Sequence, residues 1–494
     1  MKRKDDLTKI VCTIGPASEK RETLEAMIKA GMDVARLNFS HGSHDWHFQA
    51  ILNLRHAAYR TGKSIGIMAD IQGPRIRIAK LENKKTKVSE FILEKGERIL
   101  LKEERSSKTL PGYIEKHIQL DSQVPLIINL KKGDPVYLDS GMIELRACQQ
   151  KYEGGWEMEV KNTGKIKIRK GINFPTLAKY IPSFTSKDKK DLAFALRQGL
   201  DFVAISFVKN AKDIINLRKR MEKISGRKKG LPLIIAKIET ITAMDNLKEI
   251  INVSDAIMVA RGDLGVEADP AKVPLYQKLM IRYSIKKGIP VIVATNMLES
   301  MTEFPRPTRA ELTDVANAVI DRTDAVMLSG ESASGMYPVR SVQIMSKIIR
   351  ATEQSPFDDA NHLPELEKQR TEGSKDLEKM TAQAIYNLVK EAKSKAIVIE
   401  NTPISFVAKL TNLRPPASML GFFGNHNPWT RKLMIFWGIT PYFSRARFTR
   451  AVSTLGNYIH VEGKIDKHGW EYAVKVKNKE SGDNKKTGLK LNIK

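Results

Sequence analysis

Cysteine is nearly absent from this chain of 494 residues. The two cysteines, Cys12 and Cys148, lie far apart in the sequence, and Cys12 sits inside the apolar run KIVCTIG. So few thiols cannot form the disulfide framework of a small secreted protein. They are typical of reduced, structural thiols in a cytosolic protein.

Long apolar runs are missing as well. No uninterrupted run reaches the ~18 residues typical of a membrane-spanning helix. The opening MKRKDDL leads into KIVCTIG without the hydrophobic core of a signal peptide. We therefore expect a cytoplasmic protein with no membrane partner.

Acidic residues are in short supply: 56 Asp and Glu stand against 83 Lys and Arg, a formal net charge of +27. Such a charge attracts phosphorylated metabolites, nucleic acid or anionic membranes through fields that salt screens. The sequence has no zinc-ligand spacing, no aromatic RNA-binding strand motif and no single arginine-rich helix. A basic, solvated surface explains most of the excess, and we expect nucleic acid to bind only non-specifically.

What the sequence does contain is a repeated apolar pattern. The chain is too long for one hydrophobic core and should divide into about three domains. Eight short runs rich in Val, Ile, Ala and Met recur, separated by helix-length segments and one longer gap, and such runs are typical of parallel strands buried on both faces. Eight of them predict an α/β protein built on a (β/α)8 TIM barrel. The runs start at Lys9, Asp33, Ile65, Asp201, Pro232, Asp255, Pro290 and Asp324.

The segments between the runs carry signals for helix ends. Ser18 is the expected cap of a helix after the first run, and Gly31 its expected end. Between the seventh and eighth runs, Thr308 and Glu311 have the spacing of a capping box. A strand followed by a helix, repeated, is the pattern that a TIM barrel requires.

Two further domains interrupt and follow the barrel pattern. Alternating stretches such as ERILLKEE and EMEVKN predict a small inserted antiparallel β domain, which at the barrel mouth can act as a lid. After the barrel, a polar linker leads to helix and strand patterns of a C-terminal α/β domain, whose last stretch has no clear period and ends in a basic tail. The expected division is barrel 1–77 and 171–354, inserted domain 78–170, linker 355–376 and C-terminal domain 377–494.

Polar residues gather at the carboxyl ends of the apolar runs. In a TIM barrel these ends meet at one mouth, where active sites of this fold form. One such residue alone is more often structural, but polar residues from seven strand ends together favour a functional site. The residues are Arg36, Asn38, Ser40, Asp70, Ser206, Lys237, Glu239, Asp263, Thr295, Ser329 and Glu331.

The stretch MADIQGPRIRI places Arg75 and Arg77 just after Asp70. Arginine is permanently charged and shaped for phosphate, which favours a polyanionic ligand. An isolated pair of this kind is more often part of a solvated loop. The rest of the chain decides whether this arginine pair binds a polyanion or lies in a solvated loop.

The chain resembles the pyruvate kinase family in several segments: TKIVCTIGPAS, GMDVARLNFSHGSH, DIQGPRIR, AKIE, SDAIMVARGDLGVE, VATNMLESM and PRPTRAELTDVANAVIDRTDAVMLSGESA. The resemblance runs from residue 8 to about 443 and thins across the inserted and third domains. It implies an ATP:pyruvate 2-O-phosphotransferase that transfers the phosphoryl group of phosphoenolpyruvate to ADP, giving ATP and pyruvate, the last step of glycolysis. It also implies a homotetramer.

The resemblance assigns roles to residues at the mouth. Glu239 and Asp263 match the carboxylates that hold Mg²⁺, or Mn²⁺ in its place, and hard oxygen ligands suit such an ion. Lys237 matches the group that stabilises the charge of the transferring phosphoryl. Arg36 matches the arginine that grips the phosphate.

Three more positions match substrate contacts. Ser206 and Gly262 match substrate-binding positions, and the backbone amides at Gly262 suit the substrate carboxylate. Thr295 matches the threonine associated with protonating the enolate, through water because a hydroxyl is too weak an acid to act alone. The alternative for Thr295 is a strand-end threonine bonded to the backbone.

Asn38, His41, Arg77 and Lys170 match nucleotide-contacting positions, although His41 could equally be a packing residue. The nucleotide is ADP as substrate and ATP as product.

A monovalent cation is the last implied ligand. Family members with glutamate at the position of Arg75 need K⁺, which binds near the residues matching Asn38, Ser40 and Asp70, whereas members with lysine there do not. Arg75 supplies a positive charge beside Asp70, so we predict activity without K⁺. The loop IENTPIS in the third domain has an acid, a proline and no glycine, a poor anion nest, so we do not expect control by fructose-1,6-bisphosphate.

Two alternatives remain open from the residues alone. A Mg²⁺-dependent barrel lyase or aldolase acting on 2-oxo acids would need similar carboxylates but no nucleotide and no lid. A catalytically impaired scaffold would bind polyanions through the +27 surface. The complete set Arg36, Lys237, Glu239, Asp263 and Thr295 argues against the scaffold.

Overall fold

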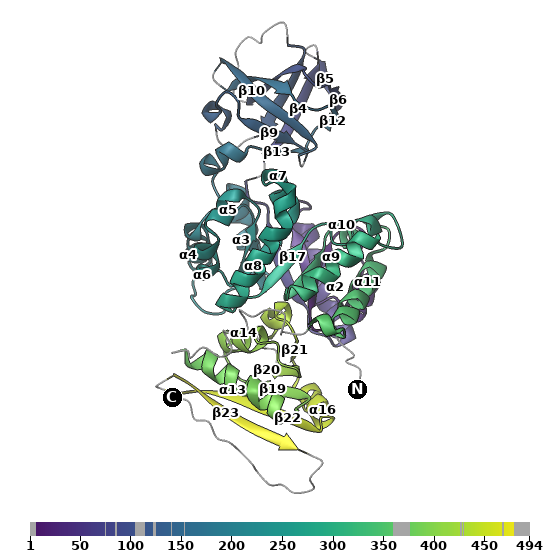
Figure 1. Ribbon diagram of the computed structural model, residues 1–494, viewed down its shortest axis with the longest axis vertical. Coiled ribbons are helices and arrows are strands. Elements are labelled where there is room, and N and C mark those ends of the chain that lie inside the picture. Colours follow the sequence, from purple (N-terminus) through teal and green to yellow (C-terminus); the bar gives the residue numbers. More distant parts are fainter. Residues whose placement is uncertain are drawn as a thin grey trace.

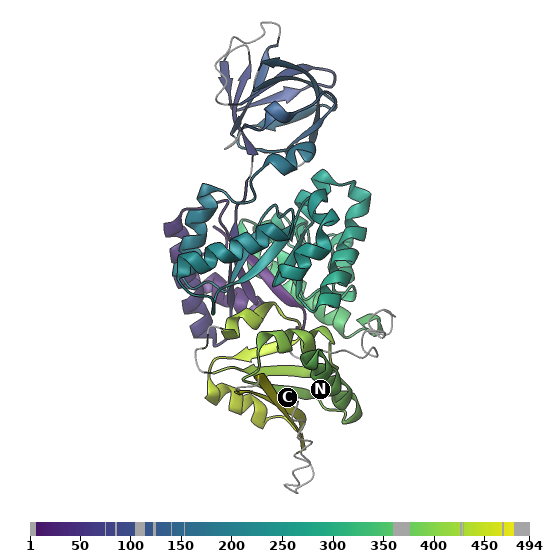
Figure 2. The ribbon, with the colours of Figure 1, turned by 90° about the vertical axis from the view of Figure 1, so that its left-hand side faces the viewer.

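The computed structural model describes residues 6–74, 76–83, 86–103, 114–121, 125–139, 141–152, 154–358, 376–424, 427, 429–466 and 469–478. Three bodies follow one another along the long axis: the inserted β domain, the barrel and the C-terminal domain (Figures 1 and 2). Arg75, most of the predicted linker 355–376 and the basic tail from residue 479 lie outside the described residues.

Eight parallel strands form a closed barrel in the order β1-β18-β17-β16-β15-β14-β3-β2. The prediction of a TIM barrel is confirmed, and each expected apolar run supplies one strand. Strands such as β1 and β3 are buried along their whole length because helices cover the outside and side chains fill the inside. The strands are β1 (Lys9–Ile14), β2 (Val34–Asn38), β3 (Gly66–Ile71), β14 (Phe202–Ile205), β15 (Leu233–Ile238), β16 (Ala256–Ala260), β17 (Val291–Ala294) and β18 (Ala325–Leu328).

Helices surround this barrel, and the signals for their ends are mostly confirmed. Gly31 ends the first helix with φ 128°, and Thr308 and Glu311 form the expected capping box. The cap assigned to Ser18 is wrong: the helix starts later, after Lys20, and the Ser18 hydroxyl accepts a hydrogen bond from the Gly15 amide at 3.2 Å instead. The main outer helices are α1 (Arg21–Ala30), α2 (His44–Thr61), α3 (Ser186–Arg197), α4 (Ala211–Ser225), α6 (Leu247–Val253), α8 (Val273–Lys287), α9 (Arg309–Ile320) and α11 (Pro338–Glu353). Short helices follow strand ends at α5 (Ile241–Asp245), α7 (Arg261–Glu267) and α10 (Gly330–Ala333).

The inserted domain is a β domain that closes on itself, because β13 pairs with both β9 and β4. Its pairs are antiparallel, as the sequence predicts, with the exception of β7 and β8, which run parallel. The sheet also extends past the predicted limits of 78 and 170, since β4 and β13 pair with each other at the base of the domain. The strands are β4 (Ile76–Asn83), β5 (Thr86–Val88), β6 (Glu90–Leu93), β7 (Arg98–Glu103), β8 (Lys116–Asp121), β9 (Pro135–Leu138), β10 (Ile143–Tyr152), β11 (Gly155–Val160), β12 (Gly164–Lys167) and β13 (Gly171–Asn173).

The C-terminal domain is a five-stranded sheet in the order β21-β20-β19-β22-β23. Its last two strands form a hairpin in the stretch where the sequence predicted no structure. Its elements are α13 (Leu377–Glu391), β19 (Ala396–Glu400), α14 (Ile404–Asn412), β20 (Ser418–Phe422), α15 (Trp429–Lys432), β21 (Ile439–Tyr442), α16 (Arg445–Ser453), β22 (Asn457–Asp466) and β23 (Gly469–Asn478).

The hydrophobic cores show how the three bodies are joined. Side chains at the base of the barrel, such as Val11 and Phe202, belong to one cluster with C-terminal residues such as Phe406 and Ile435. The inserted domain has a separate cluster of its own. The C-terminal domain therefore packs on the barrel through a shared core, whereas the inserted domain has a core of its own and two chain connections to the barrel.

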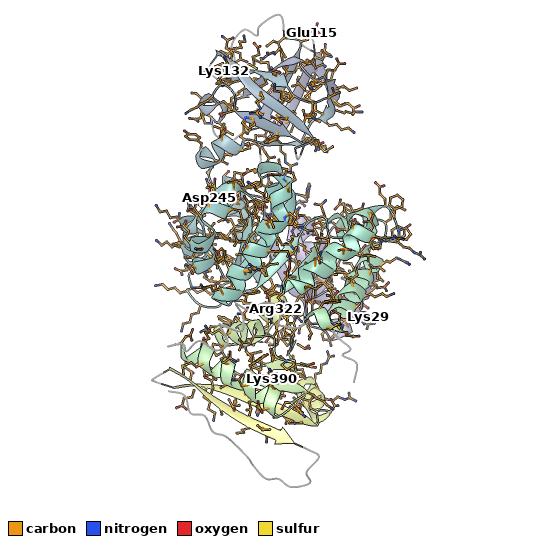
Figure 3. The ribbon with its side chains drawn as sticks, viewed as in Figure 1. Lys29, Glu115, Lys132, Asp245, Arg322 and Lys390 are labelled. Carbon is orange, nitrogen blue, oxygen red and sulfur yellow. The ribbon has the colours of Figure 1, made fainter. Side chains whose placement is uncertain are left out.

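Basic side chains are spread over all three bodies, with Lys132 on the inserted domain, Lys29 on the barrel and Lys390 on the C-terminal domain (Figure 3). Among the helices described, none combines the length and the apolar character needed to cross a bilayer.

Candidate active site

Lys237 lies at the centre of the barrel mouth. Its ammonium donates to Ser206 Oγ at 2.7 Å, and it lies 2.8 Å from Glu239 Oε1 and 3.3 Å from Asp70 Oδ1. All four residues are buried. Burial by itself would lower the pKa of Lys237, but the charges of Asp70 and Glu239 raise it above its usual value, so the ammonium stays charged.

Arg36 joins this cluster from β2. Its Nε donates to Asp70 Oδ2 at 2.7 Å, its Nη2 lies 2.6 Å from the same oxygen, and its Nη1 donates to Thr13 Oγ1 at 2.8 Å. Burial would raise the pKa of Asp70, but Lys237 and Arg36 hold it below its usual value. Asp70 is thus an ionised carboxylate that holds two cations at the mouth.

Glu239 is a buried carboxylate whose charge is incompletely balanced. Its Oε2 accepts from the Phe207 amide at 2.6 Å, and its Oε1 lies 2.8 Å from the Lys237 ammonium. Burial and the nearby Asp263 raise the pKa of Glu239 despite Lys237. A divalent cation suits this arrangement, because it offsets both carboxylates and takes hard oxygen ligands.

No group of three or more His, Cys, Asp and Glu side chains that could hold a metal occurs in the part of the chain the structure describes. A metal held by Glu239 and Asp263 would therefore take its other ligands from water and substrate, as Mg²⁺ commonly does.

The end of β17 lies against the first turn of α7. The Gly262 amide donates to Thr295 Oγ1 at 2.8 Å, and the same hydroxyl donates to the Ala294 carbonyl at 2.6 Å. Thr295 has φ 68° and Asn296 φ 54°, two consecutive non-glycine residues in the left-handed region. Such backbone strain persists where surrounding contacts enforce it.

Arg261 enforces that strain, and the sequence reasoning missed it. Its Nη2 donates to the Thr295 carbonyl at 2.6 Å and its Nη1 to Asp314 Oδ1 at 2.7 Å. The only signal was its place beside Gly262 in the segment MVARGDLGVE.

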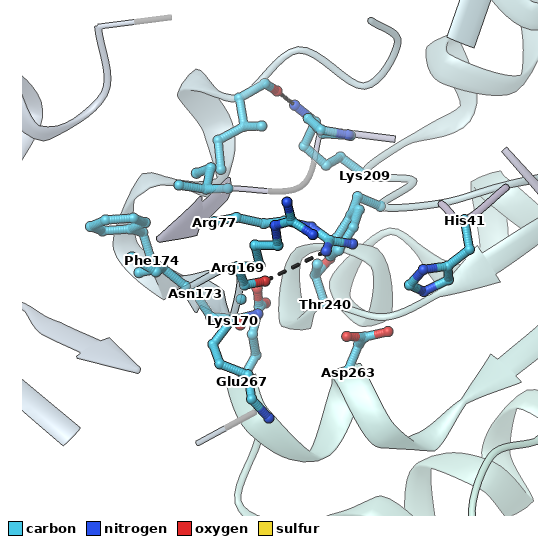
Figure 4. A pocket seen from close by; sticks show the side chains of 16 residues that line it. His41, Arg77, Arg169, Lys170, Asn173, Phe174, Lys209, Thr240, Asp263 and Glu267 are labelled. Carbon is cyan, nitrogen blue, oxygen red and sulfur yellow. Dashed lines mark hydrogen bonds between the residues drawn. The ribbon is translucent and has the colours of Figure 1, made fainter. Parts of the chain in front are cut away.

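A cavity of about 240 Å³ lies between the barrel mouth and the inserted domain (Figure 4). It brings together four residues predicted from the sequence: His41, Arg77, Lys170 and Asp263. The Arg77 guanidinium donates to the Arg169 carbonyl at 3.5 Å, and the Lys170 ammonium lies 2.9 Å from Asp139 Oδ1. Three other charged residues line it that the sequence analysis did not select, namely Arg169, Lys209 and Glu267.

Asn38, Ser40 and Asp70 also lie together. Asn38 and Asp70 are paired neighbours on β2 and β3, and Asn38 Oδ1 accepts from the Ser40 amide at 3.1 Å. The fourth residue of this predicted cation group, Arg75, lies outside the described residues.

Ser329 and Glu331 have a structural role at the end of β18. Glu331 is fully buried and accepts from the amides of Leu298 at 3.0 Å and Ser329 at 2.7 Å. These contacts hold the backbone after β17 and β18.

Comparison with known proteins decides the family. A family model described as "Pyruvate kinase, barrel domain" matches residues 5–342. The chain belongs to the pyruvate kinase family. A pyruvate kinase of Geobacillus stearothermophilus is 40% identical over 444 residues, which cover 89% of this chain and 71% of that protein. One of Sporosarcina psychrophila is 40% identical, covering 88% and 71%, and one of Staphylococcus haemolyticus (strain JCSC1435) is 38% identical, covering 90% and 72%.

These matches confirm the resemblance seen in the sequence. They support the function of a pyruvate kinase, which is a phosphotransferase. They argue against the lyase or aldolase alternative. The relatives are longer than this chain, as the covered shares of 71–72% show.

Proposed function

We propose that the barrel mouth transfers the phosphoryl group of phosphoenolpyruvate to ADP. The bond between the phosphorus and the enol oxygen breaks, a bond to a terminal oxygen of ADP forms, and the enolate takes a proton to give pyruvate. The observation that carries the proposal is the Lys237 ammonium, kept charged by Asp70 at 3.3 Å and Glu239 at 2.8 Å.

Lys237 and Arg36 supply the positive charge of the protein. The phosphoryl in transfer spreads negative charge over its oxygens, and pre-positioned cations stabilise that charge without reorganising. Arg36 is anchored through Asp70 and Thr13, which fixes its guanidinium at the mouth. Ser206 fixes the Lys237 ammonium by accepting its hydrogen bond at 2.7 Å.

Glu239 and Asp263 would hold Mg²⁺, or Mn²⁺ in its place. When bound, the ion supplies a charge that polarises phosphate and enolate oxygens. The turn that carries Gly262 and Asp263 suits the substrate carboxylate, and the Gly262 amide, which donates to Thr295 Oγ1 at 2.8 Å in this structure, would exchange that acceptor for the substrate.

Thr295 would protonate the enolate through water. Its hydroxyl accepts from the Gly262 amide and donates its one hydrogen to the Ala294 carbonyl, so this hydrogen would have to turn from the carbonyl to the water for the transfer. The strained turn that Arg261 supports fixes the position of the hydroxyl. A proton delivered at this strand end reaches one face of the substrate only.

Arg77, Lys170, His41 and Asn38 would bind the nucleotide. The support is the shared cavity, which has cations of the inserted domain on one side and Asp263 on the other. This arrangement places a polyphosphate between the lid and the metal ligands.

Activity without K⁺ is part of the proposal. Both oxygens of Asp70 contact cations of the chain itself, Arg36 and Lys237. Arg75 follows this carboxylate closely in sequence and would add a further positive charge.

We further propose a cytoplasmic homotetramer without fructose-1,6-bisphosphate control. An apolar groove between α9 and α11, lined by Leu312, Ile320 and Phe357, supports association between copies. At the end of β19, just before this loop, Glu400 is already paired with Arg445 and His460, and its charge disfavours a bound phosphate.

Coupling the reaction to lactate dehydrogenase tests the proposed function. Phosphoenolpyruvate with ADP should give pyruvate, and EDTA should stop the reaction. No turnover with intact folding would favour the polyanion-binding scaffold, and turnover that survives EDTA would refute the metal assignment.

A further inference from the structure

Helix α3 begins where the chain returns from the inserted domain. The chain leaves the barrel through Gly73 and comes back after Asn173, and the capping box of α3 follows at Thr185 and Asp188. The two connections that position the inserted domain therefore come close to the first turn of one barrel helix.

Asp188 joins the start of α3 to the exit connection. It is fully buried; its Oδ2 accepts from the Thr185 amide and the Thr185 hydroxyl, each at 2.7 Å, and its Oδ1 accepts from the Gly73 amide at 3.0 Å. A capping box needs only the bonds to Thr185. The bond to Gly73 is an additional one, made 115 residues away in sequence.

Gly73 in turn rests on the catalytic cluster. It has φ 67°, and a Cβ at this position would lie 3.0 Å from Ser206 Cβ and 3.2 Å from Phe207 Cδ2. Ser206 accepts from Lys237, and the Phe207 amide donates to Glu239. Asp188 thus holds Gly73, where the chain leaves the barrel for the inserted domain, against Ser206 and Phe207.

The same helix also holds the loop after β2. Lys187 Nζ donates to the Phe39 carbonyl at 2.6 Å and to Asp191 Oδ2 at 2.6 Å, and Asp191 Oδ1 lies 2.7 Å from His44 Nε2. This loop carries His41, which lines the cavity. The start of α3 therefore contacts both Gly73, where the chain leaves for the inserted domain, and the loop after β2, which lines the cavity.

We propose that Asp188 is a positioning residue for the nucleotide. By fixing Gly73 it sets the direction in which β4 leaves the barrel, and β4 carries Arg77 and pairs with β13, directly after Lys170. The inference rests on the proposed function, because it takes Arg77 and Lys170 to bind ADP. The groups proposed to bind phosphoenolpyruvate are all on the barrel, so Asp188 should affect the two substrates differently.

Three variants test the proposal. Asp188→Ala removes the Gly73 contact and should lower kcat/KM for ADP by ~10-fold or more, since small displacements of binding groups cost that much. The Kd of phosphoenolpyruvate in the absence of ADP should stay within about twofold of wild type, because the contacts of Lys237 with Ser206, Asp70 and Glu239 remain when Asp188 is replaced. Asp188→Asn keeps one acceptor oxygen and should fall between wild type and Asp188→Ala.

Thr185→Ala is the matched control. It removes the capping hydroxyl but leaves the carboxylate bonded to Gly73, so it should lower Tm with kcat/KM for ADP near wild type. An equal loss of ADP efficiency in Thr185→Ala, or equal losses for both substrates in Asp188→Ala, would show a merely structural role and overturn the proposal. If Asp188→Ala does not fold, Asp188→Asn is judged by the same criteria.

Hydrogen exchange gives a readout that does not depend on activity. Amides of residues 71–73 should exchange faster in Asp188→Ala or Asp188→Asn than in Thr185→Ala. Unchanged exchange in the Asp188 variants would overturn the anchoring of Gly73. A wild-type protein without turnover would instead refute the proposed function, and the exchange result would still decide the anchoring.

Discussion

The Lys237 ammonium lies 2.8 Å from Glu239 Oε1, and both groups are buried at the mouth of the barrel. Lys237 lies on β15 and Glu239 directly follows the last residue of this strand, so the two side chains, two positions apart, point to the same side at the strand end. One strand end thereby positions both Lys237, the cation proposed to face the phosphoryl group, and Glu239, the carboxylate proposed to bind the metal.

Removing this cation should abolish transfer without abolishing binding. We expect Lys237→Met to lower kcat by ~10³-fold, because the ammonium acts on charge that develops in the transition state. Phosphoenolpyruvate binding, measured by titration, should change little, since Arg36 and the Gly262 amide remain. Loss of binding together with kcat would mean that Lys237 holds the substrate in its ground state.

Arg77 and Lys170 should affect the nucleotide selectively. We expect Arg77→Met or Lys170→Met to raise KM for ADP by ~10-fold, the scale of one lost charge-assisted hydrogen bond, with the Kd of phosphoenolpyruvate unchanged. Lys167→Met is the control, because this lysine lies on β12 with its side chain 56% exposed and outside the cavity. An equal effect of the control variant would point to the general charge of the lid instead.

Potassium should have little influence on the rate. We expect the coupled assay in sodium-free Tris buffer to give similar rates with and without KCl, because Asp70 already has cationic partners. Arg75→Glu should introduce activation by K⁺. Many-fold activation of the wild type by K⁺ would refute the assignment.

Glu267 gives the stability a specific pH dependence. Burial raises its pKa to about 7 in the folded protein, helped by Glu239 and Asp263, from 4.5 for an ordinary glutamate. As pH rises, the carboxyl of Glu267 ionises in the unfolded chain before it ionises in the folded protein. The free energy of unfolding therefore falls between pH 4.5 and about pH 7 and then levels off.

Glu267→Gln should remove this dependence. In EDTA we expect the variant to be more stable than wild type at pH 8, by on the order of 3 kcal/mol, and similar to it near pH 4. Denaturant unfolding at both pH values measures the difference. A stability gain that is equal at both pH values would show that packing, and not the buried charge, is responsible.

The barrel and its mouth could be predicted because their signal is local. Each strand is a short apolar run, and the polar residue at its end is adjacent in sequence, as with Lys237 and Glu239 after LIIA. Parallel strands bring these ends together without further information.

Other features depend on contacts between distant segments. Asp188 looks like an ordinary capping residue, and only the fold brings its second oxygen to Gly73. The hairpin of β22 and β23 was missed because few apolar residues, among them Ile459 and Val474, stand among many charged ones, and β19 supplies the strand beside it. Ser18 failed as a cap because the turn after β1 uses its hydroxyl.

The most direct test of the account is the position of a divalent cation. Anomalous scattering from crystals grown with Mn²⁺ and phosphoenolpyruvate locates the ion independently of activity. We predict one peak within coordination distance of both Glu239 and Asp263, with the substrate phosphate facing Lys237 and Arg36. An ion bound away from both carboxylates, or a phosphate turned away from Lys237, would contradict the central claim.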